Sequence, residues 1–272
     1  MYSLKVIIEW CGNKNSGDNM KVVCVFNQKG GVGKTTTNIN IASYVALKDN
    51  KVLVIDMDPQ GNTTSGFGID KEKLEYSTYD LLLSDASMDL VIQSVESTGN
   101  IEIIPSNIEL AGADLELAML PDREKILKSR LDGIVEKYDY VFIDCPPSLG
   151  LLTINALTAA NSVIIPMQCE YYALEGISQL IKTINLVKKG LNKDLEIEGV
   201  VLTMFDSRRN LQLQVAEELK SYFGELVYEN TIPRNVRLAE APSFGLPIFA
   251  YDGKCKGAES YSDLADEFLR KQ

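Results

Sequence analysis

A glycine-rich loop directly after a short apolar run is the feature that most constrains how this chain can fold. The run Val22–Phe26 predicts a buried strand, and the helix-forming residues after the loop predict a helix that begins near Lys34. Gly30, Gly31 and Gly33 allow positive φ angles, which bring backbone N–H groups against a bound anion. The helix N-terminus adds unpaired donors and the positive end of its dipole. Strand, loop and helix together predict a polyphosphate site.

The side chains at the end of the loop suit a magnesium nucleotide. Lys34 can reach the terminal phosphates, and the Thr35 hydroxyl can ligate the Mg²⁺ bound to them. The strict pattern GxxxxGK[ST] requires glycine at position 28, where this chain has Gln28. A second lysine, Lys29, stands at the loop entrance instead. A glycine turn with solvated lysines is disfavoured, because all parts of the motif occur in the required order.

This form of the loop resembles the deviant Walker A motif of the ParA/MinD family of dimeric ATPases. In that family the entrance lysine, here Lys29, crosses the dimer interface and neutralises the nucleotide of the partner. The resemblance implies ATP and Mg²⁺ as cofactors. It also implies nucleotide contacts by the whole loop, which comprises Lys29, Gly30, Gly31, Val32, Gly33, Lys34, Thr35 and Thr36.

Carboxylates follow two further apolar runs. Val52–Ile55 ends in Asp56 and Asp58, and the run from Tyr140 ends in Asp144. Runs that are apolar throughout indicate parallel strands covered on both faces, and the carboxyl ends of such strands line the ligand crevice. Asp144 has the form of a Walker B aspartate that holds a water in the magnesium shell.

The two aspartates after Val52–Ile55 differ in their expected roles. A water that attacks a γ-phosphate needs an orienting acceptor, which a carboxylate can provide. In the ParA family the aspartate of the DPQGN segment has that role, which here falls on Asp58. Asp56 is a candidate helper in the magnesium and hydrogen-bond shell. Solvated acids in a strand-end turn remain the alternative for both.

Length and composition fit one large α/β domain. The chain has 272 residues and 45% hydrophobic content, enough to bury a full core over residues 21–272. Residues 1–20 form an N-terminal extension without the basic region and cleavage site of a signal peptide. No run of 18 apolar residues predicts a transmembrane helix. Five scattered cysteines suit reduced thiols in a cytoplasm, and the absence of histidine excludes a histidine base or metal ligand.

Alternating strands and helices predict the fold class: α/β, a mainly parallel twisted sheet with helices on both faces. The remaining expected strands cover 101–104, 162–167, 199–205 and 227–232. The expected helices cover 36–47, 78–83, 88–95, 107–120, 122–137, 171–189, 211–223 and 258–269. The apolar stripe of helix 171–189 is typical of core packing.

Two further predictions come from the resemblance. No NKxD motif for guanine is in place, so adenine is favoured, and the family grips the base near Pro233 and Asn235. In the chromosomal ParA proteins, often called Soj, arginines at the positions of Arg208 and Arg237 contact DNA without sequence preference. The chain has 27 basic against 38 acidic residues, so DNA binding needs a local basic patch. Solvated surface arginines are the alternative.

Residues 21–271 resemble Soj/ParA chromosome or plasmid partition ATPases in the phrases NQKGGVGKTTT, DPQGN, IDCPPSLGLLTINAL, QCEYYALEG and IPRNVRLAEAPS. The resemblance implies a cytoplasmic, nucleoid-associated ATPase with slow basal turnover. It implies an ATP-bound homodimer that binds DNA non-specifically and a ParB-type partner that stimulates hydrolysis and releases it. The sequence does not distinguish chromosome, plasmid or protein cluster as cargo.

Three other classes share the loop. A MinD-like membrane ATPase would require a basic amphipathic C-terminal helix, whereas residues 259–271 carry four acids against two bases. Stable membrane association is therefore not expected. An iron–sulfur protein would need a second cysteine suitably placed beside Cys145 to bridge a cluster between subunits. A metabolic ligase with its own substrate pocket remains open.

Overall fold

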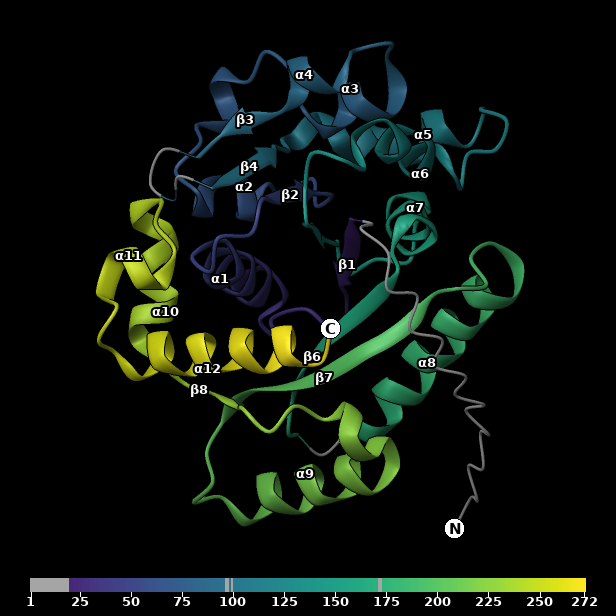
Figure 1. Cartoon of the computed structure of the whole chain (residues 1–272). Helices are drawn as coiled ribbons and strands as arrows, with labels where there is room; N and C mark the ends of the chain where they lie inside the picture. The colour runs from purple at the N-terminus through teal and green to yellow at the C-terminus, as the bar shows by residue number, and fades with distance from the viewer. Residues whose placement is uncertain (1–19, 96–97, 99, 171–172) are drawn as a thin grey trace.

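The computed structural model describes residues 20–95, 98, 100–170 and 173–272. Within these residues, eight strands form one sheet in the order β3-β4-β2-β5-β1-β6-β7-β8 (Figure 1). Every pairing is parallel except that of β3 with β4, so the predicted fold class is confirmed. The strands are β1 Lys21–Val25, β2 Val52–Asp56, β3 Gln93–Ser94, β4 Ile101–Ile104, β5 Tyr140–Asp144, β6 Ser162–Gln168, β7 Glu196–Phe205 and β8 Ile232–Pro233.

Helices cover both faces of this sheet (Figure 1). One face is covered by α1 (Lys34–Ala46), α10 (Val236–Glu240), α11 (Ile248–Asp252) and α12 (Lys256–Arg270). The other face is covered by α3 (Thr78–Leu83), α4 (Met88–Val91), α5 (Ala113–Leu117), α6 (Ile126–Leu131), α7 (Leu151–Ala159), α8 (Ala173–Gly190) and α9 (Asn210–Phe223). A short helix, α2 (Asn62–Gly66), follows β2.

The central strands are buried because both of their faces are apolar. All five residues of β2 are buried, and so are four of the five in β1 and in β5. The described apolar stripe of α8 packs against the same core, as predicted. Within the described residues, no helix is both long enough and apolar enough to span a membrane. Residues 1–19, most of the predicted extension, lie outside the described residues, as do Tyr171 and Tyr172 at the predicted start of α8.

Three expected helices are wrong in extent. Range 107–120 contains a 3₁₀ turn and then the short α5, and range 122–137 contains α6 and then a second 3₁₀ turn. Gly112 weakens the helix expected over 107–120, and Gly133 weakens the one expected over 122–137. Asp122, at the expected start of the second helix, has a positive φ of 48°, which is not helical. Range 88–95 ends as the strand β3, which pairs with the edge of β4. The helices α2, α7, α10 and α11 were not predicted.

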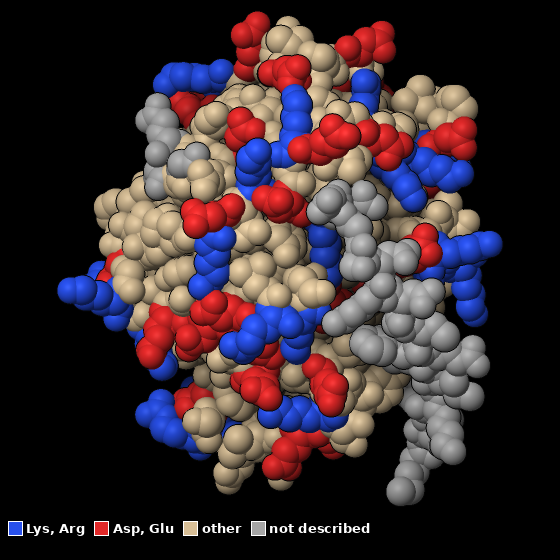
Figure 2. Space-filling model, viewed as in Figure 1, with Lys and Arg blue, Asp and Glu red and all other residues tan. Residues whose placement is uncertain are grey.

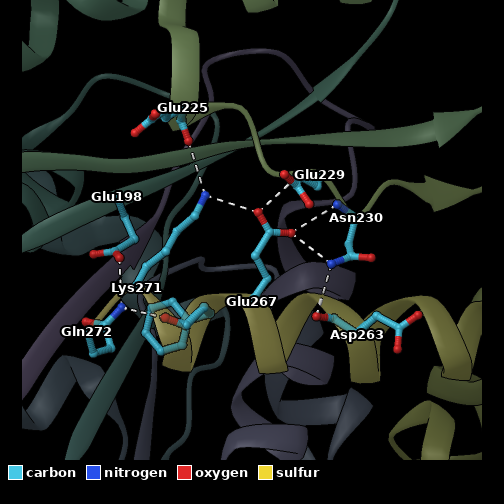
Figure 3. Close-up of polar contacts among 9 residues, drawn as sticks. Glu198, Glu225, Glu229, Asn230, Asp263, Glu267, Lys271 and Gln272 are labelled. Carbon is cyan, nitrogen blue, oxygen red and sulfur yellow. Dashed lines mark hydrogen bonds and ion pairs between the residues drawn. The ribbon is translucent and has the colours of Figure 1, made fainter.

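The expected strand 227–232 is also mostly wrong, for a reason visible in Figure 3. The N–H of Tyr228 donates to the carbonyl of Val200 at 3.0 Å, as in a strand. The next two N–H groups, of Glu229 and Asn230, donate instead to the Glu267 carboxylate of α12 at 2.9 and 3.0 Å. A side chain thus replaces the neighbouring strand, and ladder pairing resumes only at β8.

Candidate nucleotide site

The parallel strands bring the predicted site residues to one edge of the sheet. The loop follows β1, and Asp56 and Asp144 end β2 and β5. Asp144 is in register with Val25 on one side and with Asp56 on the other. The carboxyl ends of three adjacent strands therefore meet, as expected for a ligand crevice in an open α/β sheet.

The loop has the backbone conformation that its glycines predict, with one exception. Gly31 and Gly33 have φ angles of 73° and 88°, and Gly33 immediately precedes α1. Gly30 does not have a positive φ, and a Cβ there would meet no atom within 4 Å, so the conformational prediction was wrong at this position. The helix start at Lys34 agrees with the prediction.

Two side chains from neighbouring strands hold the loop, and sequence reasoning did not find them. The Thr203 hydroxyl of β7 donates to the carbonyl of Val32 at 2.8 Å. The Gln168 amide at the end of β6 donates to the carbonyl of Gly31 at 2.9 Å. Both bonds engage carbonyl groups, so neither occupies a loop N–H group that could bind an anion.

Asp144 and Thr35 form a site that fits a hard cation. One Asp144 oxygen, Oδ2, accepts hydrogen bonds from the hydroxyls of Thr35 and Thr63 at 2.7 and 2.8 Å. The other oxygen, Oδ1, is buried and has no hydrogen-bond partner among the described residues. Burial raises the pKa of Asp144, although both hydroxyls act to lower it. An unpartnered buried carboxylate oxygen beside a threonine hydroxyl matches the oxygen ligands and retained waters that Mg²⁺ prefers.

Asp56 organises the segment that carries Asp58. The Asp56 carboxylate accepts hydrogen bonds from the Asp58 N–H at 3.1 Å and from the Thr64 N–H and hydroxyl at 2.9 and 2.7 Å. Burial raises the pKa of Asp56, and the neighbouring Asp144 carboxylate raises it further. In this structure Asp56 positions its own turn, and Thr64 is its main partner.

Asp58 lies at the same edge, with 9% of its surface exposed. The Asp58 side chain accepts from the Gln60 N–H at 2.9 Å, and its carbonyl accepts from the Ser106 hydroxyl at 2.9 Å. The following Gly61 has a φ of 58°, and a Cβ there would come within 2.6 Å of the Ser106 carbonyl. Only glycine therefore fits this turn.

The two lysines of the loop have different surroundings. Lys34 is 8% exposed, and its ammonium donates to the carbonyl of Lys29 at 3.3 Å. Burial lowers the pKa of Lys34, although the Asp144 and Asp58 carboxylates act to raise it. The Lys29 side chain is about half exposed, and its ammonium pairs with Glu170 at 2.5 Å. Lys34 thus faces the site, whereas Lys29 lies at its rim.

Comparison with known proteins identifies the family. An AAA domain model matches residues 20–197. The sporulation initiation inhibitor protein Soj of Bacillus subtilis is 56% identical over 247 residues, which cover 91% of this chain and 97% of Soj. The chromosome partitioning protein ParA of Myxococcus xanthus is 51% identical over 251 residues, which cover 92% of this chain and 88% of that protein. This chain belongs to the Soj/ParA family.

Two solved structures resemble this Soj/ParA chain along most of its length. The cobyrinic acid a,c-diamide synthase of Mycobacterium smegmatis, with a bound ATP analogue and magnesium, has a TM-score of 0.80 and 38% identity, and the match covers 92% of this chain and 95% of that one. A putative plasmid partition protein of Borrelia burgdorferi, bound to AMPPNP, has a TM-score of 0.79 and 29% identity, and the match covers 93% and 100%. These ligands agree with ATP and Mg²⁺ as the predicted cofactors.

The predicted base-binding segment begins at the end of β8. Pro233 ends this strand, and Asn235 caps α10 by accepting the Arg237 N–H at 2.8 Å. The preceding Ile232 is in register with Thr203, the residue that holds the phosphate loop. In the Soj/ParA fold the segment therefore lies next to β7, the strand whose Thr203 contacts the loop.

The two predicted DNA-binding arginines are exposed and ion-paired. The Arg208 guanidinium donates to both oxygens of Asp206, at 2.9 and 3.1 Å. These bonds lower the pKa of Asp206 to about 2. Arg237 pairs with Glu240 at 2.9 Å and with Asp252 at 3.4 Å. Both arginines follow strands, β7 and β8, that run parallel, so both lie at the carboxyl edge of the sheet.

The cysteines of this family member are thiols where they are described. Cys24, Cys145, Cys169 and Cys255 are free, and Cys11 lies outside the described residues. The Cys145 sulfur lies 3.1 Å from that of Cys24, a neighbour that the sequence did not indicate. Both side chains are fully buried, so this pair cannot bridge a cluster between two subunits.

Proposed function

We propose that this protein is an ATP-dependent partition ATPase that separates DNA molecules or moves a DNA-bound cargo. The observation that carries the proposal is the buried Asp144 oxygen without a partner among the described residues, next to Thr35 and the phosphate loop. Such an oxygen is costly unless a cation or its bound water completes the site. The 51% sequence identity with the chromosome partitioning protein ParA of Myxococcus xanthus supports partition as the process that uses this chemistry.

The proposed reaction is hydrolysis of ATP to ADP and phosphate. Thr35 and a water on Asp144 would hold Mg²⁺, which would neutralise charge that develops on the phosphates. Lys34 binds the terminal phosphates, and Asp58 orients the attacking water. Lys29 leaves Glu170 and reaches the nucleotide of a second subunit, so that ATP favours a homodimer. Basal turnover is slow, because a partner must complete the arrangement.

The proposed partners are DNA and a ParB-type protein. Arg208 and Arg237 contact DNA phosphates without reading the sequence, since arginine is suited to phosphate. A ParB-type protein stimulates hydrolysis, which dissolves the dimer and releases the DNA. The protein then works in the cytoplasm on the nucleoid, and stable membrane binding is not part of the cycle.

Asp58→Ala tests the catalytic part of this proposal. The variant should bind ATP, accumulate as a dimer and lose at least about tenfold in turnover, because the water loses its orienting acceptor. Light scattering after gel filtration and phosphate release measure both effects. Asp85→Ala, which removes an exposed carboxylate between α3 and α4, is the matched control. Normal hydrolysis by Asp58→Ala would remove the proposed role.

DNA retention tests the partition role itself. Wild-type protein should bind a DNA duplex with ATP, and binding should be weak with ADP or without nucleotide and should fall steeply as salt rises. Arg237→Glu should abolish retention while ATP-dependent dimerisation persists. Arg270→Glu, near the end of α12, carries the same charge change as a control. ATP turnover without any DNA binding would favour a metabolic relative such as the synthase.

A further inference from the structure

The arginines of the proposed DNA surface form ion pairs with carboxylates. After β7, Arg208 and Arg209 share one acid, Asp206, whose side chain is 26% exposed and lies 3.6 Å from Arg209. Arg208 itself is 88% exposed, and its guanidinium is held by this acid. Two cations thus face one anion in this loop.

At α10 the acids outnumber the basic residue, the reverse of the loop after β7. Arg237 is a single cation that pairs with two acids, Glu240 and Asp252. The Tyr251 hydroxyl also donates to Glu240 at 3.1 Å, which fixes this carboxylate beside the guanidinium. The local charge that Arg237 presents to an approaching phosphate is therefore cancelled or reversed.

Basic and acidic side chains also alternate over the surface seen in Figure 2, where blue and red groups adjoin each other and no wide basic area appears among the described residues. With a formal net charge of −11, the rest of the molecule does not compensate for the local acids. Arg208 and Arg237 must then contact phosphates in competition with a carboxylate, and screening by salt leaves this short-range competition intact.

Resting on the DNA binding proposed above, we propose that Asp206 and Glu240 are negative determinants of that binding: they hold the arginines in the free subunit and keep one subunit's affinity for DNA too low for retention. Two subunits joined by ATP present both arginine sites twice on one duplex. The second set of contacts then forms at high effective concentration, which raises avidity without any new kind of contact. The acids thus make DNA retention conditional on dimerisation.

The proposal predicts an unusual gain of function. In Asp206→Asn and Glu240→Gln the side chains keep their size and still accept hydrogen bonds, but the competing charge is gone. Removing one charge about 6 Å from a phosphate strengthens binding roughly threefold in water, and both changes together on the order of tenfold. The salt dependence of binding should also become steeper, by about one unit of log–log slope for each phosphate that is newly neutralised.

The experiment measures binding of a fluorescent duplex of random sequence, long enough for a dimer, to full-length protein with ADP and with ATP, over a range of salt. The double variant Asp206→Asn with Glu240→Gln is compared with wild type. The control is Asp89→Asn with Asp122→Asn, which removes two acids that pair with Lys137 and Lys125 away from these strands. Thermal unfolding and ATP turnover without DNA confirm that each variant is folded and that its nucleotide site is intact.

The expected result is that the double variant retains DNA in the ADP state, binds about tenfold tighter than wild type and has the steeper salt slope, while the control resembles wild type. Weaker binding would mean that the acids orient the arginines toward DNA, and would overturn the proposal. Equal gains in the control would mean that net charge alone acts, and would also overturn it. If wild-type protein binds DNA with ATP but the double variant binds no tighter than wild type, this inference alone is overturned. Absence of binding by every form would overturn the proposed function with it.

Discussion

Two buried carboxylate sites in this molecule contrast sharply. Glu267 of α12 accepts from the Glu229 and Asn230 N–H groups, from the Asn230 amide at 2.8 Å and from Lys271 at 3.1 Å (Figure 3). Burial by itself would raise the pKa of Glu267, but these donors outweigh it and lower the pKa. Asp144 is also buried, yet one of its oxygens has no partner among the described residues, and its pKa is raised.

The difference separates a structural carboxylate from a functional one. The chain supplies every donor that Glu267 needs, so the charged form is stable within the fold. At the nucleotide edge, Asp144 and Asp56 are in register side by side, and the chain leaves their charge incompletely compensated. Such a site becomes stable when a cation arrives, which is why unfavourable electrostatics gather where a ligand binds.

The largest expected effect tests the structural carboxylate. Glu267→Ala should lower the free energy of unfolding by about 2 kcal/mol, because two part-buried N–H groups lose their acceptor. Denaturant unfolding measures the change. Glu259→Ala, which removes a mostly exposed acid paired with Lys256, should cost less than about 1 kcal/mol. A small loss in Glu267→Ala would show that water replaces the carboxylate.

The same residue predicts a pH dependence. The pKa of Glu267 in the folded protein lies below its ordinary value of 4.5. Its contribution to stability is therefore full above pH 4.5 and is lost as the pH falls through the lowered pKa. Unfolding experiments from about pH 6 down to about pH 3 should show less acid sensitivity in Glu267→Gln than in wild type.

The functional carboxylate should behave in the opposite way. In Asp144→Asn, the amide oxygen can still accept from Thr35 and Thr63, while the uncompensated charge is removed. In protein free of metal and nucleotide at about pH 8, we expect the free energy of unfolding to rise by about 1 kcal/mol. The pKa of Asp144 is raised in the folded protein, so the wild-type protein loses stability as the pH rises above about 4. Below about pH 4 the carboxyl is protonated in both states, and Asp144→Asn should then be no more stable than wild type.

Nucleotide supplies the second half of this test. Wild-type protein should be stabilised by Mg²⁺ with ATP, and Asp144→Asn should lose most of that stabilisation, because its magnesium shell is incomplete. Thermal unfolding with ATP and either Mg²⁺ or a chelator separates the two contributions. If Asp144→Asn, without ligand, loses as much stability as Glu267→Ala does, the two carboxylates do not differ in the way described here.

The smallest expected effect concerns two buried asparagines of α1, which differ in their hydrogen bonds. Asn40 donates to the carbonyl of Thr36 and accepts the Ile248 N–H, both at 2.8 Å, and so ties α1 to α11. Asn38 is fully buried, and neither atom of its amide has a hydrogen-bond partner among the described residues. Asn40→Ala should cost about 1–2 kcal/mol, whereas Asn38→Ala should be neutral or gain about 0.5 kcal/mol. Denaturant unfolding compares the two, and equal losses would mean that packing outweighs hydrogen bonding at both positions.

The sequence by itself determined the loop, the strands that end in aspartate and the family. These features are local: an apolar run, its turn and the residues after it lie within a few positions of each other, and physical rules for strands and glycines act at that range. Lys34, Thr35 and Asp144 could therefore be named from the sequence alone, as could the parallel sheet.

Only the tertiary structure decided which groups meet across long separations. Thr203 and Gln168 hold the loop from strands more than a hundred residues away, and Glu267 replaces a strand partner for Glu229 and Asn230. The Asp252 carboxylate beside Arg237 likewise comes from another helix, α11. No periodicity in the sequence encodes these contacts, because they depend on how helices and strands are placed against each other in space.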